Sequence, residues 1–207
     1  MSVKLVTATP NGEKIMTYTA RVSNVQNQEN KNITRLLKYC LRNGHVSIFE
    51  TAYMTVEINT TISIANQLVR HRSFTFQQFS QRYANVNDLG NMSIPDLRRQ
   101  DFKNRQNSID DIDSDKKQYF QDKIQKHFND SFELYNEMIE YGIAKECARF
   151  VLPLSSPTKL YMTGNCRSWI HYLQSRTHES TQKEHREIAL KIKEIFKEVY
   201  PTIYELL

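Results

Sequence analysis

The sequence is poor in glycine and cysteine and has no long hydrophobic run. Only five of its 207 residues are glycine, and neither GxGxxG nor GxxxxGK[S/T] occurs. Any nucleotide site must therefore hold phosphate with side chains rather than with a glycine-rich loop. The three cysteines, Cys40, Cys147 and Cys166, form no CxxC pair, and the six histidines are dispersed. This usage favours free thiols in a reducing compartment and predicts no metal site.

No stretch approaches the roughly 20 apolar residues that span a membrane. The first residues, MSVKLVTATPNGEK, lack the apolar core of a signal peptide. These features predict a cytoplasmic protein without a membrane partner. What the chain has instead is positive charge, with a net charge of +5 and a pI near 9.0. Such a charge favours an anionic partner (nucleic acid, nucleotide or membrane surface) or serves solubility alone.

Hydrophobic periodicity predicts one α+β domain over residues 1–207, with few strands and several helices. Strands are expected at 3–8 and 49–59, the second because Met54, Val56 and Ile58 alternate with polar residues. Helices are expected at 32–45, 60–72, 114–142, 144–153, 163–177 and 180–201. Residues 84–113 show no clear period, which predicts a long irregular segment that is functional or mobile.

Residues 70–83, RHRSFTFQQFSQRY, combine cations, hydroxyls, amides and aromatic rings without an acid. Arginine binds phosphate as a planar fork, and Phe and Tyr rings offer stacking faces for a base or a flavin. The stretch therefore favours a site for phosphate beside a planar heterocycle. The alternative is an exposed helix end, where Arg70, His71 and Arg72 complement the helix dipole.

More cations recur in the C-terminal third of the chain. Arg167 and His171 are four residues apart and share one face of the helix expected there, and Arg149 and Arg176 lie on either side. No acid occurs between positions 146 and 179, so neighbours in the sequence cannot neutralise these charges. The pattern is suggestive of anion binding, although charge runs are commonly solvated faces.

The RHR pattern followed by seven residues and Ser80 resembles the signature of the flavin-dependent thymidylate synthases, the ThyX family. The resemblance continues in family order through TARVSN, NGHVSIFE, KNRQNS, GIAKECARFVLPL, NCRSWIHYLQSRT and QKEH. It covers almost the whole chain, which is most similar in character to short viral and phage members. It implies a homotetramer of α+β subunits, each with a small, mostly antiparallel sheet, and active sites built from several chains. It also implies conversion of dUMP to dTMP, with methylenetetrahydrofolate as carbon donor and NADPH reducing FAD.

The resemblance also implies which residues form the site. FAD would contact His45, Ser47, Arg70, His71, Arg72, Gln78, Asn165, Cys166, Arg167 and His171. dUMP would contact Gln67, Arg70, Gln78, Ser80, Gln81, Arg82, Arg149 and Arg176. Arg176 matches the catalytic arginine that favours ionisation of the uracil at N3, so no cysteine nucleophile is required. The resemblance implies no metal and no nucleic acid partner.

Gln78 departs from the family pattern, which commonly has Glu at this position. Glutamine keeps the shape and one acceptor but removes a negative charge and adds a donor pair. Two alternatives stay open on the sequence. One is a related flavin enzyme with a different product, such as a hydroxymethylated pyrimidine, and the other is a basic nucleic-acid-binding module without enzymatic activity.

Overall fold

The computed structural model describes residues 1–90 and 92–206, so Asn91 and Leu207, which fall in the predicted domain, lie outside the described residues. The chain forms two compact units. Unit 1 comprises Met1–Ile58, Val69–Gln77 and Tyr161–Leu207, and unit 2 comprises Asn59–Leu68 and Gln78–Leu160. The predicted single domain over 1–207 stays a prediction.

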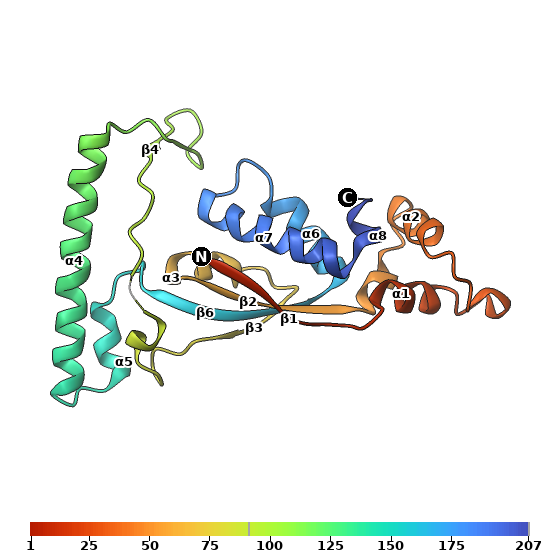
Figure 1. Cartoon of the computed structure of the whole chain (residues 1–207), viewed down its shortest axis with the longest axis horizontal. Helices are drawn as coiled ribbons and strands as arrows, with labels where there is room; N and C mark the ends of the chain where they lie inside the picture. Colours follow the sequence, from red (N-terminus) through yellow and green to blue (C-terminus); the bar gives the residue numbers. More distant parts are fainter. Residues whose placement is uncertain (91, 207) are drawn as a thin grey trace. The chain divides into compact units, whose positions relative to one another are not determined.

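The main sheet has four strands in the order β1 (Ser2–Ala8), β2 (Tyr53–Thr61), β6 (Pro157–Asn165) and β3 (Thr75–Gln78) (Figure 1). In β2 the predicted alternation is confirmed, because Met54, Val56 and Ile58 are fully buried. Side-chain hydrogen bonds join Thr55 to Thr163 at 2.9 Å and Tyr161 to Glu57 at 3.0 Å. These pairs run in opposite senses along β2 and β6, so the two strands are antiparallel. Together with the helices, the sheet confirms the α+β fold class.

Strands β3 and β6 and one helix were missed by periodicity. Residues 163–165 were assigned to a helix, but they end β6, and the helix begins only at Cys166. The boundary is set by Asn165, whose side chain accepts a hydrogen bond from the Ser168 amide at 2.9 Å and so caps the helix. Helix α1 (Gly12–Ala20) was also missed. The last long helix ends at Val199, directly before Pro201 as predicted, and Pro201 then begins the short helix α8 (Pro201–Tyr204).

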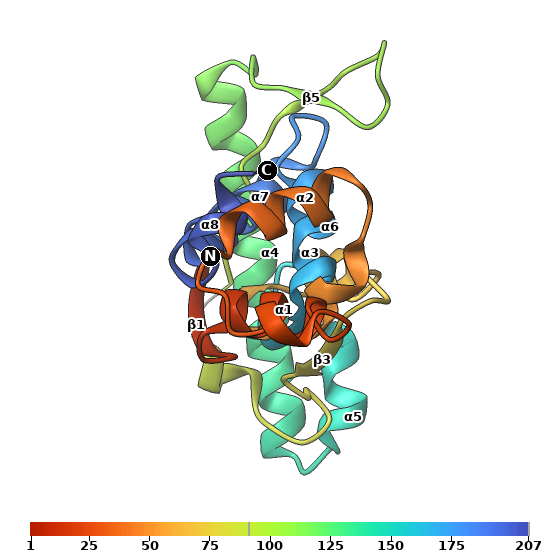
Figure 2. The same cartoon turned by 90° about the vertical axis from the view of Figure 1, so that its right-hand side faces the viewer.

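Unit 1 packs its C-terminal helices on one face of the sheet. Helices α6 (Cys166–Arg176) and α7 (Lys183–Val199) contact each other, and α7 contacts β1 (Figure 1). The N-terminal helices α1 and α2 (Thr34–Arg42) and the 3-10 turns η1 (Val25–Asn27) and η2 (Val46–Glu50) lie at the end of unit 1 that faces the viewer in Figure 2. Buried Glu13 ties the chain ends together by accepting the Ile203 amide hydrogen bond at 2.9 Å.

An aromatic cluster forms the centre of unit 1. The Phe74 ring lies 4.6 Å from the Trp169 ring and 5.9 Å from the Tyr172 ring. It also lies directly over Gly164, where an added Cβ would approach the ring to 2.4 Å. The proposed stacking role for the rings of residues 70–83 is therefore wrong for Phe74, because its ring is buried against other core side chains.

Unit 2 contains helix α3 (Ile62–Leu68), the long helix α4 (Ser114–Glu140), helix α5 (Lys145–Ala148) and the 3-10 turns η3 (Val86–Leu89) and η4 (Arg149–Val151). Helix α3 ends earlier than expected, and Val69, assigned to a core face, is 38% exposed. On α4, Phe128 and Tyr135 are buried as predicted, whereas Phe120 is 51% exposed. The helix begins at the Asp113 cap and is followed by Gly142 with φ 94°, which suits a helix stop.

The segment 84–113 is more ordered than its sequence indicates. Strands β4 (Arg99–Gln100) and β5 (Ser108–Ile109) form an antiparallel hairpin. Polar contacts hold it, including an Arg99–Asp111 ion pair of 2.5 Å and hydrogen bonds to the Asp101 carboxylate. Because hydrogen bonds rather than an apolar stripe order this segment, hydrophobic periodicity could not find it. In the described part of the chain, no helix is long and apolar enough to cross a membrane.

Candidate active site

A cavity of about 900 Å³ opens in unit 1 between the end of α2, the turn η2 and helix α6. Three of the predicted FAD residues, Asn165, Arg167 and His171, line it. Arg167 and His171 therefore share one face of α6, as their spacing predicted. The remaining lining is contributed by the residues Leu41, Arg42, Val46, Glu50, Ser73, Ser168, Ile170, Gln174 and Leu206.

Arg167 is paired with an acid that is distant in sequence. Its guanidinium donates a short hydrogen bond to the Glu50 carboxylate, and both side chains are about half exposed. Neighbours in the sequence supply no acid to Arg167, and the fold brings one from η2 instead. A pair this exposed contributes little stability, since water screens it. An anionic ligand could replace Glu50 as the partner of the Arg167 guanidinium at a small cost in free energy.

The start of α6 is a polar edge of the cavity. Asn165 is fixed as the helix cap, and the Ser168 hydroxyl donates to the Ser73 carbonyl at 3.2 Å. Cys166 lies between them, but its side chain is fully buried and does not line the cavity. Burial raises the pKa of the Cys166 thiol, so this sulfur is a packed, protonated group.

The other predicted FAD residues of unit 1 lie outside the cavity lining. His45, Ser47, Arg70 and Arg72 are exposed. The His45 ring stands edge-on to the Tyr39 ring with centroids 5.6 Å apart. Their assignment stays a prediction. Arg42, in the last turn of α2, was missed as a lining residue, although a cation at a helix end before NGHVSIFE was the available signal.

Arg176 and His71 meet directly in unit 1. The Arg176 Nε donates a hydrogen bond of 2.9 Å to His71 Nε2. Burial and the positive charge of Arg176 lower the pKa of His71 to about 4, so the ring is neutral and can accept. The residue at the centre of the RHR pattern therefore orients the arginine that was predicted to be catalytic, and sequence spacing alone could not show this contact.

Unit 2 holds the predicted nucleotide residues of the QQFSQR stretch. Gln78 Nε2 donates to the Thr158 hydroxyl at 3.3 Å, and Arg82 Nε donates to Glu146 Oε2 at 2.6 Å. The Nε2 of Gln81 is buried, and none of residues 1–90 or 92–206 accepts a hydrogen bond from it. A buried donor without a partner costs free energy, so an acceptor from a ligand would be favourable there.

The remaining predicted residues of unit 2 differ in exposure. Ser80 is exposed, and Gln67 is half-buried on α3. The Arg149 guanidinium lies 6.0 Å from the Phe150 ring centroid, and that ring is 83% exposed. The predicted dUMP set falls in both units, with Arg70 and Arg176 in unit 1 and the other members in unit 2.

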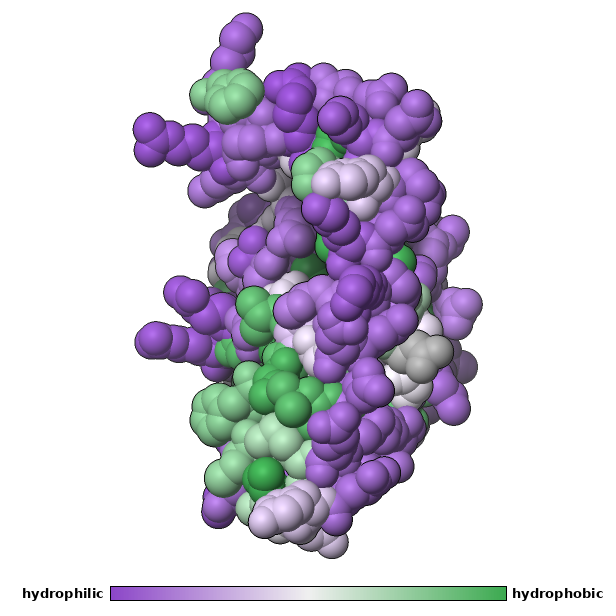
Figure 3. All heavy atoms as spheres, turned by 90° about the vertical axis from the view of Figure 1, so that its left-hand side faces the viewer, coloured by the Kyte–Doolittle hydropathy of each residue, from purple (hydrophilic) through white to green (hydrophobic). Residues whose placement is uncertain are grey.

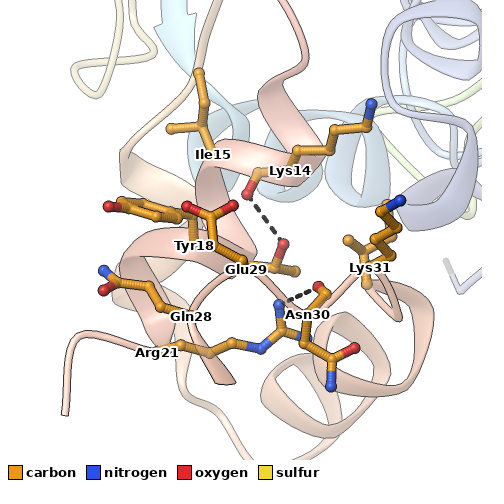
Figure 4. A pocket seen from close by; sticks show the side chains of 10 residues that line it. Lys14, Ile15, Tyr18, Arg21, Gln28, Glu29, Asn30 and Lys31 are labelled. Carbon is orange, nitrogen blue, oxygen red and sulfur yellow. Dashed lines mark hydrogen bonds between the residues drawn. The ribbon is translucent and has the colours of Figure 1, made fainter. Parts of the chain in front are cut away.

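A second cavity of unit 1, of about 630 Å³, contains none of the predicted site residues. It lies between α1 and the following loop, with Lys14, Tyr18 and Lys31 around it (Figure 4). Arg21, part of the TARVSN block, closes one side by donating to the Asn30 carbonyl at 2.7 Å and to the Asn32 carbonyl at 2.8 Å. Arg21 therefore anchors this loop. Among the described residues, no three side chains of metal-ligand type converge.

Comparisons with known proteins agree with the sequence motifs. Residues 4–202 match the family described as thymidylate synthase complementing protein. A probable flavin-dependent thymidylate synthase of Paramecium bursaria Chlorella virus 1 is 49% identical, with 100% of this chain and 99% of the relative covered. A flavin-dependent thymidylate synthase of Synechocystis is 51% identical over 92% of this chain and 87% of the relative.

Solved structures of the UMP/dUMP methylase PolB from Streptomyces cacaoi share the fold. The structure bound with 5-Br dUMP has a TM-score of 0.82 at 27% identity, covering 99% of this chain and 93% of PolB. The structure bound with 5-Br UMP has a TM-score of 0.88 at 28% identity, covering 99% and 92%. Because the family match spans nearly the whole chain and two relatives are about half identical, this chain belongs to the thymidylate synthase complementing protein family, the flavin-dependent thymidylate synthases.

Proposed function

We propose that this protein is an FAD-dependent thymidylate synthase that methylates dUMP, with methylenetetrahydrofolate as carbon donor and NADPH as reductant. The observation that carries the proposal is the Arg176–His71 hydrogen bond, which presents an oriented guanidinium, and no carboxylate of residues 1–90 or 92–206 pairs with it. The names of the two half-identical relatives support the flavin and the reaction. A reducing compartment such as the cytoplasm suits Cys40, Cys147 and Cys166, which are all free thiols.

The large cavity of unit 1 suits FAD in size and chemistry. Ligand sites commonly measure about 300–1,000 Å³, and this cavity has about 900 Å³. Arg42 and Arg167 could bind phosphate oxygens, while Asn165 and His171 could donate or accept hydrogen bonds. When bound, FAD supplies the hydride chemistry that the side chains cannot perform. The protein residues bind and orient the ligands and exclude water.

Arg176 would stabilise negative charge on the pyrimidine. Its Nε is committed to His71, so its two terminal nitrogens remain for a ligand. A guanidinium aimed at a uracil favours loss of the N3 proton, because it stabilises the anion where charge develops. Ionisation raises the electron density at C5, where the new bond forms, so a cysteine nucleophile is not required. This agrees with Cys40 and Cys166 being buried, protonated thiols.

The names of the half-identical relatives and of PolB support methylation over a hydroxymethylated product, the alternative that Gln78 raised. The Gln78 amide is held by the Thr158 hydroxyl, so it stands as a neutral, ordered side chain. A glutamate at this position could accept the Thr158 hydroxyl proton in a hydrogen bond of similar length. We therefore expect Gln78→Glu to keep the fold and to retain dTMP formation, with turnover equal to or above that of the native protein. A large loss of turnover would show that this chain depends on the neutral amide.

A homotetramer would cover apolar surface that a single chain exposes. Figure 3, which faces the α4 side, shows apolar side chains gathered toward the lower left. Exposed apolar residues of unit 2 include Leu134, Tyr141, Phe150 and Leu154. Contiguous apolar surface of this kind favours association between copies. Light scattering of the purified protein tests the proposal, and a monomer at micromolar concentration would contradict it.

The flavin spectrum gives the first test. Purified protein should be yellow, or should bind added FAD with a shift in its visible absorption, and dUMP should perturb that spectrum further. Arg167→Ala should weaken FAD binding, whereas Arg35→Ala, an exposed arginine on α2 outside the cavity lining, should not. A protein that neither carries nor takes up FAD would overturn the proposal. Tight, salt-sensitive DNA binding by that colourless protein would instead support a nucleic-acid-binding module.

A further inference from the structure

His185 is a fully buried imidazole at the start of α7. An aliphatic side chain at this place would be buried at a lower cost in free energy. Burying a polar ring costs free energy unless its nitrogens find partners. A hydrogen bond of 3.2 Å joins His185 Nε2 to the hydroxyl of Tyr172, which is also fully buried. This hydrogen bond joins the Tyr172 hydroxyl to His185 Nε2, so neither a Phe at 172 nor an apolar residue at 185 alone would be equivalent.

The His185–Tyr172 pair packs against the residue that holds Arg176. The Tyr172 ring stands edge-on to the His71 ring at 5.0 Å, and the His185 ring stands edge-on to it at 6.2 Å. His71 in turn accepts the Arg176 Nε hydrogen bond. Two ring contacts from two helices therefore fix the plane of His71, and that plane determines where its Nε2 lone pair points.

The choice of imidazole has an electrostatic consequence. A carboxylate would also orient Arg176, but it would neutralise the positive charge that a uracil anion needs. Burial and Arg176 lower the pKa of both His71 and His185 to about 4, so both rings are neutral at physiological pH. The other titratable groups beside them are Tyr172, which burial keeps protonated, and His171. Arg176 is thus held in place by a neutral ring, and no acid in the described part of the chain neutralises its charge.

We infer that His185 is a positioning residue for the reaction, acting through Tyr172 and His71 to fix the guanidinium of Arg176. The inference rests on the proposed function, and it adds a residue that Tyr172, His71 and Arg176 separate from the substrate. Its effect should fall on turnover rather than on FAD binding. A misplacement of a catalytic group by roughly 1 Å can lower a rate by about a hundredfold, so a smaller displacement should lower kcat by about tenfold.

The test is a double-mutant cycle on the full-length protein. His185→Phe keeps a ring but removes both nitrogens, Tyr172→Phe removes the hydroxyl, and a third variant carries both changes. Each should lower kcat by about tenfold with FAD affinity and dUMP KM nearly unchanged. The double variant should lose no more than either single one, because all three break the same hydrogen bond. His185→Gln, which keeps polar atoms, should recover part of the loss.

A matched control separates positioning from general destabilisation. Ile188→Val alters another fully buried side chain of α7 and leaves the His185–Tyr172 hydrogen bond in place, so it should lower the melting temperature but leave kcat unchanged. An NMR readout does not depend on activity. The Arg176 Nε–H signal of ¹⁵N-labelled protein, assigned with Arg176→Lys, should shift or broaden in His185→Phe and stay in place in Ile188→Val.

The outcomes distinguish this inference from the proposed function. If the native protein binds FAD but forms no dTMP, the proposed function fails, and the role of His185 in that reaction fails with it. If the native protein is active, the inference is overturned by a kcat within twofold of native in His185→Phe. An unchanged Arg176 Nε–H signal in His185→Phe would also overturn the inference. So would a double variant whose loss of kcat equals the sum of the two single losses in free energy.

Discussion

The predicted site residues of the two units are held in different ways. In unit 1, Arg176 is fixed by a neutral histidine inside an aromatic cluster, and Asn165 is fixed as a helix cap. In unit 2, Arg82 makes one exposed ion pair with Glu146, and Arg149 lies beside an exposed ring. Unit 1 therefore holds its catalytic charge in place before a ligand binds. In unit 2 a ligand can replace the partners of the cations at a small cost in free energy.

This difference indicates that the predicted site residues of unit 1 and those of unit 2 have different roles. Interactions that stabilise charge in a transition state must be in place before the reaction, because reorganising them would raise the barrier. Interactions that hold a phosphate can form on binding. We expect substitutions in the unit 1 cluster to act on turnover and substitutions of the exposed cations of unit 2 to act mainly on affinity.

The largest expected effect comes from Arg176→Ala. Removing a donor aimed at developing negative charge commonly lowers turnover by about 10²–10³-fold, and dTMP formation should fall by at least that factor. The FAD spectrum should be retained, because Arg176 does not line the large cavity. Arg186→Ala is a matched control, since Arg186 lies on α7 and its side chain donates to the Thr177 carbonyl. Near-native turnover of Arg176→Ala would contradict the distinction between a pre-organised charge in unit 1 and replaceable cations in unit 2.

Gly164→Ala tests whether the aromatic cluster is as tightly packed as the structure indicates. The new Cβ would lie 2.4 Å from the Phe74 ring, and overpacking of this kind costs about 1–3 kcal/mol. Urea unfolding followed by the fluorescence of Trp169, the only tryptophan, measures it. Gly44→Asn serves as the control. Its φ of 69° is a conformation that Asn tolerates, and nothing lies within 4 Å of an added Cβ. Equal stability losses would argue against a tight cluster.

Acid should weaken unit 1 before it affects the charged hairpin of unit 2. His71 and His185 have pKa values of about 4 in the folded protein against an ordinary 6.5. Below pH 6.5 the unfolded chain therefore binds more protons, so stability falls as the pH drops from about 6.5 to about 4 and is independent of these groups above that window. In the hairpin, the pKa values of Asp101 and Asp111 are lowered from 3.8, so their contribution is lost only in stronger acid.

Urea midpoints read by Trp169 fluorescence at pH 7 and pH 5 measure this dependence. His127→Gln, which changes an exposed histidine on α4, should leave the difference between the two midpoints unchanged. His185→Phe should reduce the difference, because one of the two titrating rings is removed. A midpoint that does not change between pH 7 and pH 5 would contradict neutral, buried histidines in unit 1.

The smallest effect is expected from Glu146→Gln. The Arg82–Glu146 pair is exposed on both sides, so its loss should change the free energy of unfolding by about 1 kcal/mol or less. Affinity for dUMP should stay the same or rise, because Arg82 is released. Glu140→Gln, on the exposed end of α4, is the charge-matched control. A stability loss as large as that of Gly164→Ala would show that unit 2 is not loosely held.

Sequence reasoning recovered the parts of the site that depend on local order. Motif order gave the family, and helical spacing placed Arg167 and His171 on one face of α6. It could not find the Arg167–Glu50 pair, the Arg176–His71 hydrogen bond or the buried His185, because each joins side chains that only the tertiary fold brings together. Strand β6 escaped because its buried face carries Thr158 and Gly164 beside Leu160 and Met162, which leaves two apolar residues to mark the alternation.

The same limit applies to the irregular segment. Its composition correctly indicated no hydrophobic stripe, yet carboxylates and arginines order the β4–β5 hairpin through hydrogen bonds that no periodicity records. For Phe74, composition indicated a stacking face, but packing against Gly164 and Trp169 places the ring in the core. Whether a residue is buried depends on which residues the fold packs against it, and local patterns in a single sequence do not show these contacts.

The most direct test of the account is the mass of the nucleotide formed from dUMP. Native protein and Arg176→Ala are incubated side by side with FAD, NADPH and methylenetetrahydrofolate, with NADPH and methylenetetrahydrofolate omitted in turn. Native protein should form dTMP, which is dUMP with one methyl group in place of the C5 hydrogen, and only in the complete mixture. A hydroxymethylated nucleotide, or equal dTMP formation by Arg176→Ala, would contradict the account.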